Sequence, residues 1–358
     1  MTAVLDLASH PHRRFNPLSG EWVLVSPQRT ERPWRGTVEE PALRDGAEYD
    51  PACYLCPRNR RAGGARNPVY RQTFVFTNDF PALLPDTPDS LAQDPQSLFR
   101  VQSERGTCRV VCFSPRHDAS IGELDAAALA QVIDVWAEQY AELGADPLVS
   151  HVQVFENRGA LMGASSPHPH GQIWAGEHVP VQVAREQERQ LTHYAAHGST
   201  LLGDYLSVEL ASGERLVCLN EHFAAVVPFW AAWPFETLVI SKRRVSSLVD
   251  LTIAERDSLA DMVSRMATRY DNLFEAFFPY SMGIHQSLTD RRPHPEWHLH
   301  MHFYPPLLRS ATVGKFMAGF ELLAEAQRDI TPEHAARTLR SLDERHHRLA
   351  AGAQHRAS

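Results

Sequence analysis

The two halves of the chain carry the same sequence patterns in the same order. Residues 75–82 (VFTNDFPA) resemble residues 217–224 (VCLNEHFA), and a strand pattern that ends at Ser114 before a helix resembles residues 237–241 before another helix. HPHGQ at 168–172 then takes the place that HLHMH has at 298–302. The offset drifts between roughly 127 and 143 residues, as expected when a repeated unit changes its loops. Coincidence in an ordinary α+β protein is the alternative, and the shared order favours duplication.

Strand patterns followed by one helix, twice over, predict an α+β fold with a largely antiparallel sheet. Helices are expected over 123–143, where apolar residues recur at helical spacing before Gly144, from Thr252 onward, and after Thr331-Pro332. Strands are expected at 21–26, 73–77, 109–114, 151–156, 171–175, 216–220, 237–241 and 297–304.

Length and charge narrow the class of protein. The 358 residues suffice for two units of ~150 residues, and a net charge of −8 argues against an extended nucleic-acid groove. The apolar run 223–235 contains two prolines and is too short to cross a membrane, and the first residues lack the apolar segment of a signal peptide. Five cysteines do not suit a disulfide framework. We therefore expect a cytoplasmic protein with no nucleic-acid or membrane partner.

Histidines on alternating positions are the strongest signal of chemistry. On a strand, residues two apart share a face, so His168, His170 and Gln172 would point the same way. Burying two imidazoles and an amide together is costly without ligands. The tripeptide recurs at residues 10–12 without a following strand of this kind, and there we expect no site.

Metal ligands are the second signal. Cys53-x-x-Cys56 with two histidines would form a tetrahedral zinc site, and a redox pair is the alternative. Alternating histidines at 298, 300 and 302, with His285 upstream, suit metal ligands better than a solvated stripe, because Phe303-Tyr304 beside them implies burial. The arginines could bind phosphate or form a charged surface, and the sequence leaves both open: Arg13, Arg14, Arg29 and Arg32.

Residues 156–174 (ENRGALMGASSPHPHGQIW) resemble the signature of the galactose-1-phosphate uridylyltransferase family of the histidine-triad superfamily. The likeness runs from about residue 10 to the region of residue 327. It includes 25–29 (VSPQR), 76–80 (FTNDF), 230–236 (WAAWPFE) and 302–312 (HFYPPLLRSAT).

The resemblance implies two fused histidine-triad-like repeats, 1–180 and 181–358, in a largely antiparallel half-barrel sheet with helices packed on it. It implies exchange of UMP between UDP-glucose and galactose 1-phosphate, giving UDP-galactose and glucose 1-phosphate, in a homodimer with shared active sites. His170 matches the nucleophile, with Gln172 beside it as a donor to the phosphoryl oxygens. The residues that contact the uridylyl group in the family match Asn78, Asn157, Gly163, Ser165 and Gln172. The arginines that reach the phosphates from the partner subunit match Arg29 and Arg32. The hexose-contacting segment matches Lys315, Phe316, Glu321 and Gln327.

The resemblance also implies two metals. Cys53, Cys56, His117 and His168 match a structural zinc site, and a second metal, iron or zinc, matches Glu186, His285, His300 and His302. The chain departs from the family pattern at positions that bear on hexose selectivity: Phe320 and Ala318 stand where bacterial members have tyrosine and valine. Ala164 replaces a cysteine or serine beside the phosphate. His298 matches the first histidine of the triad pattern, which does not make it a ligand.

Related chemistry on the same scaffold remains an alternative. A phosphorylase of ADP-sugars or dinucleoside polyphosphates would need only small changes in base and sugar contacts. A hydrolase is disfavoured because Gln172 stands where the triad hydrolases have a third histidine. A non-catalytic zinc-binding module is disfavoured by His170.

Overall fold

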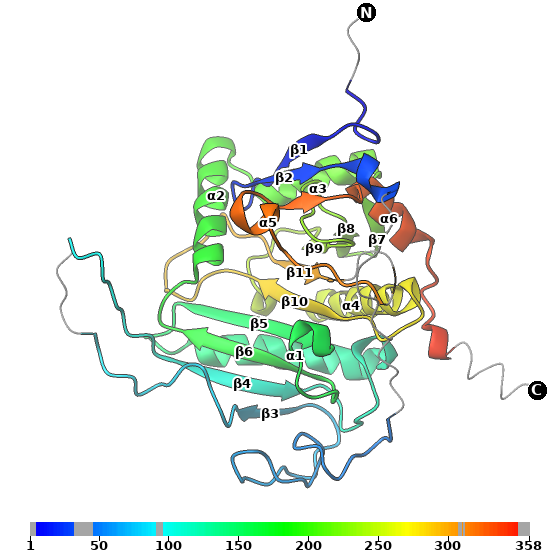
Figure 1. Ribbon diagram of the computed structural model, residues 1–358. Coiled ribbons are helices and arrows are strands. Elements are labelled where there is room, and N and C mark those ends of the chain that lie inside the picture. Colours follow the sequence, from blue (N-terminus) through cyan, green and yellow to red (C-terminus); the bar gives the residue numbers. More distant parts are fainter. Residues whose placement is uncertain (1–4, 32–45, 91–95, 307–309, 311, 350–358) are drawn as a thin grey trace, which may run out of the picture.

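A computed structural model describes residues 5–31, 46–90, 96–306, 310 and 312–349. A nine-stranded antiparallel sheet forms the centre of the fold (Figure 1). Its strands, in spatial order, are β3 (Phe74–Thr77), β4 (Gly106–Cys112), β6 (His170–Gly176), β5 (His151–Arg158), β10 (Tyr280–His285), β11 (His300–Tyr304), β9 (Thr237–Ser241), β8 (Phe223–Val226) and β7 (Leu216–Leu219).

The order of the strands reflects the repeat in the sequence. From the central β5–β10 pair outward, β5, β6, β4 and β3 on one side correspond to β10, β11, β9 and β8 on the other. The α+β prediction is confirmed, and β6 and β11 carry the two histidine motifs in equivalent places. One match in the sequence differs: residues 75–82 resemble residues 217–224, which run from β7 into β8, yet β3 takes the sheet position of β8 alone. The chain after β3 leaves the sheet, whereas β7 turns directly into β8.

Two long helices cover one face of the sheet. Both α1 (Ala126–Gly144) and α4 (Ile253–Leu273) begin with the cap that the sequence provides, Asp125 accepting from Ala128 N–H and Thr252 accepting from Glu255 N–H. Their apolar stripes bury Trp136 and Tyr270 against the sheet in the largest core. Short 3₁₀ turns flank these helices: η2 (Ile121–Glu123) and η4 (Leu248–Asp250).

The connection between the halves contains two helices that the sequence did not predict, α2 (Val181–His197) and α3 (Leu201–Ser212). The only buried residues of α2 are Val183, Glu186 and Gln190, so it lacks an apolar stripe. By contrast, α3 packs Leu202 and Leu206 on the opposite face of β8 and β9. Those strands are therefore covered on both faces, while the same face of β5 and β6 holds polar side chains.

A small second sheet lies beside the first (Figure 1). It pairs β1 (His12–Phe15) and β2 (Trp22–Val25) antiparallel, with β12 (Gln327–Arg328) parallel to β2. Around it lie η1 (Pro27–Glu31), α5 (Phe320–Leu323) and α6 (Pro332–Ser341). Arg14, fully buried, donates to Glu333 of α6 and attaches this sheet to the helix. No helix in the described part of the chain combines the length and apolar character that a membrane span requires.

The predicted helices and strands are present, with ends shifted by a few residues; 297–304, for example, forms a strand only from His300. Missed strands are β1, β8, β10 and β12. β1, β8 and β12 are each four residues long or shorter, too short for alternation to be visible in sequence. β10 has six residues, and its alternation of buried and half-buried positions was a usable signal.

Candidate active site and metal centres

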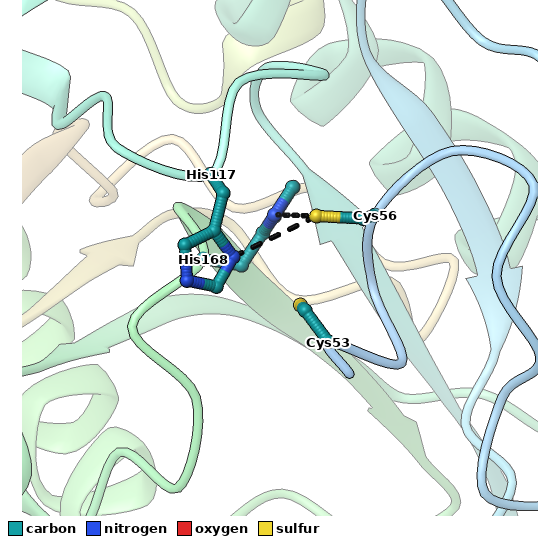
Figure 2. Close-up of side chains that lie close together, drawn as sticks. All are labelled: Cys53, Cys56, His117 and His168. Atoms are coloured by element: carbon teal, nitrogen blue, oxygen red, sulfur yellow. Dashed lines mark hydrogen bonds between the residues drawn. The ribbon is translucent and has the colours of Figure 1, made fainter. Parts of the chain in front are cut away.

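Among the described residues, two groups of side chains could each hold a metal ion. The first comprises Cys53, Cys56, His117 and His168, whose ligand atoms all lie within 4.8 Å of one another. Figure 2 shows the two cysteines approaching from one loop and the two histidine rings converging on Cys56. The Cys56 Sγ lies 3.6 Å from Nδ1 of His117 and 3.6 Å from Nδ1 of His168.

These separations fit a tetrahedral metal. Bonds of about 2.3 Å to sulfur and about 2.0 Å to nitrogen at a tetrahedral angle place the two atoms about 3.5 Å apart. Without a cation, burial raises the pKa of the Cys56 thiol to about 12, so a thiolate there needs a positive partner. All five cysteines are free thiols in the structure. The two imidazole nitrogens beside Cys56 favour metal binding over a redox pair.

Buried neighbours orient His168. Its Nε2 lies 2.9 Å from the Ser114 carbonyl and 3.0 Å from the Tyr70 hydroxyl. Donation from Nε2–H to the Ser114 carbonyl leaves the Nδ1 lone pair toward Cys56, as a metal ligand requires. The Asn67 amide donates to the Tyr54 and Cys56 carbonyls and braces the cysteine loop.

His170 begins β6, two residues after His168. Its Nδ1 lies 2.7 Å from the His168 carbonyl oxygen, so Nδ1 carries the proton and Nε2 keeps its lone pair. Burial lowers the pKa of His170, although the bond to His168 partly opposes this, and the neutral ring is favoured. A Cβ at Gly171 would lie 2.8 Å from the Phe113 ring and 2.9 Å from the Phe155 carbonyl, which is why glycine follows His170.

The side-chain amides of Gln172 and Asn157, beside His170, each accept a hydrogen bond at the oxygen atom. Trp174 Nε1–H donates to Gln172 Oε1 at 3.1 Å, and Ser281 Oγ–H donates to Asn157 Oδ1 at 2.7 Å. Each bond leaves the amide NH₂ available as a donor. The face of β5 and β6 opposite α1 therefore presents one nucleophilic nitrogen with neutral donors beside it.

The loop before His168 supplies further polar groups. Ser165 Oγ lies 3.2 Å from the Tyr54 hydroxyl, so the cysteine loop contacts this segment. Gly163, with φ of +79°, ends the 3₁₀ turn η3 (Ala160–Met162) in a conformation that favours glycine. Asn78 follows β3, and its side chain accepts from Phe80 N–H.

The second metal group comprises Glu186, His285, His300 and His302, again with ligand atoms within 4.8 Å of one another. Glu186 comes from α2, and the histidines come from β10 and β11. Its Oε2 lies 2.8 Å from His285 Nδ1 and 3.5 Å from His300 Nε2. Nε2 of both His300 and His302 is buried with no hydrogen-bond partner, an arrangement that a metal would satisfy.

The charges in this group suit metal binding. Burial alone would raise the pKa of Glu186, but His285 and His300 hold it well below its ordinary value. Burial and the neighbouring histidines hold the pKa of His302 well below its ordinary value. An ionised carboxylate and a neutral imidazole are the forms that bind metals.

The remaining predicted residues gather on the small sheet and α5, separate from the strand that carries His170. Lys315 Nζ pairs with Glu321 at 2.8 Å, and Phe316 is exposed. Asp329 joins two of the predicted residues, accepting from Gln327 Nε2 at 2.6 Å and lying 3.5 Å from Arg29 Nε. Arg32 lies outside the described residues.

The residues that orient the predicted site residues by hydrogen bonds were not predicted from the sequence. Trp174, Ser281, Tyr70, Ser114 and Asp329 each fix a side chain that a motif had singled out. No motif assigned them this role, although Trp174 ends the motif at 156–174, because such partners need only one donor or acceptor at a point in space. The position of Ser114 at the end of the strand equivalent to 237–241, which ends in Ser241, was the one usable signal.

Comparison with known proteins covers nearly the whole chain. The family described as "Galactose-1-phosphate uridyl transferase, N-terminal domain" matches residues 2–180, and that described as "Galactose-1-phosphate uridyl transferase, C-terminal domain" matches residues 186–351. The chain is 51% identical over 349 residues to galactose-1-phosphate uridylyltransferase of Haemophilus influenzae, which covers 97% of this chain and 99% of that protein. Its identity to the Rattus norvegicus protein of the same name is 49% over 352 residues, covering 98% and 92%.

A solved structure of a uridylyltransferase has the same fold. It superimposes with a TM-score of 0.74 at 28% identity, covering 92% of this chain and 97% of that one.

Proposed function

The chain belongs to the galactose-1-phosphate uridylyltransferase family, and on that premise we propose that His170 carries the uridylyl group between two sugar phosphates. The protein is a nucleotidyltransferase that transfers UMP between UDP-glucose and galactose 1-phosphate, giving UDP-galactose and glucose 1-phosphate. The observation that supports the role of His170 is the bond from its Nδ1 to the His168 carbonyl, which leaves Nε2 as a nucleophile.

The exchange takes two displacements at one phosphorus. Nε2 of His170 attacks the α-phosphorus of UDP-glucose, a P–N bond forms, and the bridging P–O bond breaks with its electrons leaving on glucose 1-phosphate. A phosphate oxygen of galactose 1-phosphate then attacks the same phosphorus, and the P–N electrons return to Nε2. The stable anionic leaving group needs no strong general acid. One binding site used twice gives ping-pong kinetics.

The same backbone contact stabilises the intermediate. With UMP on Nε2 and a proton on Nδ1, the ring is positively charged, and its bond to the His168 carbonyl becomes charge-assisted. Gln172 and Asn157 donate to the uridylyl group through amides that Trp174 and Ser281 hold in place. Ser165, Gly163 and Asn78 complete this binding site.

We propose zinc at the first metal group and iron or zinc at the second. Two thiolates and two imidazoles are a typical zinc set, and three imidazoles with one carboxylate suit either metal. Bound metal supplies structural order to the ligands and no contact with substrate. The carbonyl of His168 then accepts from Nδ1 of His170, so the orientation of the nucleophile depends on the first metal group.

We propose a homodimer in which each active site uses residues of both chains. The segment expected to contact hexose, Lys315, Phe316, Glu321 and Gln327, lies with Arg29 around the small sheet, whereas His170 lies in the large one. A second copy could bring the two groups together. The division into units 1–180 and 181–358 and the cytoplasmic location likewise remain predictions.

Mass spectrometry tests the proposed intermediate. Protein incubated with UDP-glucose alone should gain one UMP on the peptide that contains residues 168–172 and release glucose 1-phosphate. ADP-glucose, the comparison substrate, should give far less adduct. An unmodified peptide at full glucose 1-phosphate release would contradict covalent transfer, and preferential labelling by ADP-glucose would contradict the uridylyl specificity.

Gln172→His tests why glutamine occupies this place. An amide donates to a phosphoryl oxygen without titrating, whereas an imidazole can pass a proton to or from water. We expect the ratio of UDP-glucose hydrolysis to UMP transfer to rise about tenfold or more in this variant. Gln172→Ala is the matched control, since it removes the amide without adding an imidazole. An unchanged ratio in Gln172→His would reject the idea.

Mixing two inactive variants tests the shared site. Lys315→Ala removes a hexose contact and leaves Glu321 paired with Arg328, while His170→Asn removes the nucleophile. If the two co-expressed chains pair at random, half of the dimers are mixed, and each mixed dimer holds one intact site out of two. Activity should therefore return to about a quarter of the wild-type value. No recovery in dimers shown to be mixed would mean that each chain builds its site alone.

A further inference from the structure

His298 is a buried histidine that belongs to neither metal group. It precedes β11, is 1% exposed, and makes three hydrogen bonds. Its Nε2 lies 2.7 Å from the Ser241 carbonyl, and its Nδ1 lies 2.8 Å from the Thr200 hydroxyl. Its own carbonyl oxygen lies 2.8 Å from Nδ1 of His300.

His168 has the same contacts in the first half. Its Nε2 faces the Ser114 carbonyl, and its carbonyl accepts from Nδ1 of His170. The two histidines differ at Nδ1, which faces the Cys56 thiol of the first metal group in His168 and the Thr200 hydroxyl in His298. They also differ at Nε2, which in His168 lies near the Tyr70 hydroxyl as well. A hydroxyl therefore stands in the second half where a metal group stands in the first.

The donors and acceptors around His298 form one consistent chain. Nε2–H donates to the Ser241 carbonyl, so Nδ1 is a lone pair and Thr200 Oγ–H donates to it. Thr200 Oγ also accepts from Gly203 N–H, as the N-terminal cap of α3. His300 Nδ1–H donates to the His298 carbonyl, which leaves His300 Nε2 unprotonated and facing Glu186.

We propose that His298, held by Thr200 and Ser241, is the positioning residue of the second metal centre. It fixes the ring orientation and tautomer of the ligand His300 through its backbone carbonyl, as partners of metal-bound histidines do. This inference rests on the proposed metal at Glu186, His285, His300 and His302. The segment that contains α2 and α3 then supplies both the ligand Glu186 and, through Thr200, the hydrogen bond that holds His298.

Metal affinity of the second centre tests the proposal. Thr200→Val keeps the shape of the side chain and removes the hydroxyl, and Thr200→Ser restores it. We expect Thr200→Val to bind the second metal about 10- to 100-fold more weakly in competition with a chelator, with Thr200→Ser close to wild type. The metal of the Cys53 group should remain in both, and Glu186→Ala identifies which metal belongs to the second centre.

Two further variants separate positioning from general destabilisation. Thr331→Val removes an equivalent cap, since Thr331 accepts from His334 N–H at the start of α6, and should leave both metals bound. His298→Phe keeps a ring of similar shape without either ring bond, retains the Thr200 cap, and should weaken the second metal as Thr200→Val does. Wild-type affinity in both Thr200→Val and His298→Phe would overturn the positioning role alone. A wild-type protein that binds no metal sensitive to Glu186→Ala would instead overturn the metal assignment itself.

Discussion

Replacing His170 with glycine is expected to abolish UMP exchange while both metals stay bound. The variant lacks the nitrogen that forms the bond to phosphorus, and loss of a covalent nucleophile lowers kcat by on the order of 10⁴-fold or more. Both metal groups remain complete because His168, rather than His170, faces the cysteines. Exchange between UDP-glucose and labelled galactose 1-phosphate measures the loss, and metal content per chain measures the second part.

Glycine at the start of a strand also costs conformational entropy, so a second variant separates the two effects. His170→Asn keeps a polar side chain on β6 without a nucleophilic nitrogen and should be as inactive as His170→Gly. His10→Gly, in the other His-Pro-His sequence, is exposed and should remain fully active. If His170→Asn keeps near-normal exchange, His170 is not the nucleophile.

Removing one thiol of the first metal group is expected to reduce stability more than it reduces the rate. Cys56→Ala leaves three ligands, and a metal held at 1,000 times its dissociation constant contributes about 4 kcal/mol to the free energy of unfolding. For a chain of this size that corresponds to a fall in Tm of roughly 5–10 °C. The folded fraction should still transfer UMP, about 10- to 100-fold more slowly, because His168 no longer aims His170 firmly.

Cys218→Ala is the matched control for this experiment. Cys218 is another buried free thiol, but it contacts Met262 and Met266 in the core and belongs to neither metal group. Its loss should cost about 1 kcal/mol and leave the metal content unchanged. Cys56→Ala with the metal content and Tm of the wild type would contradict a structural metal at this group.

The site residues that were predicted without the family resemblance carry their own local signal. Alternation along β6 puts His170 and Gln172 on one face whatever the rest of the chain does, since it depends only on extended backbone. His168, which was expected on the same strand, lies in a bend before it. The spacing of Cys53 and Cys56 likewise needs only a tight loop. Family resemblance added His117 and Glu186, which no local pattern distinguishes, and the structure places each in a four-ligand group.

Helix α2 could not be predicted from the periodicity of apolar residues. Its buried side holds Glu186 and Gln190 in place of an apolar stripe, so periodicity gave no indication of a helix that supplies a metal ligand. The roles of Trp174, the last residue of the family motif, and of Asp329 were missed for a related reason. Each acts through one hydrogen bond to a side chain that was predicted, and a single bond leaves no pattern along the chain.

By itself the sequence determined the α+β class, the repeated order of elements, the two histidine strands and the chemistry of their side chains, because these depend on local periodicity and residue type. Only the tertiary structure decided which nitrogen of His168 and of His298 carries the proton. That choice depends on carbonyls distant in sequence, Ser114 for His168 and Ser241 for His298, whereas His170 and His300 bond to the carbonyl two residues before them. Hydrogen bonds extend about 3 Å, and only folding brings those atoms within that distance.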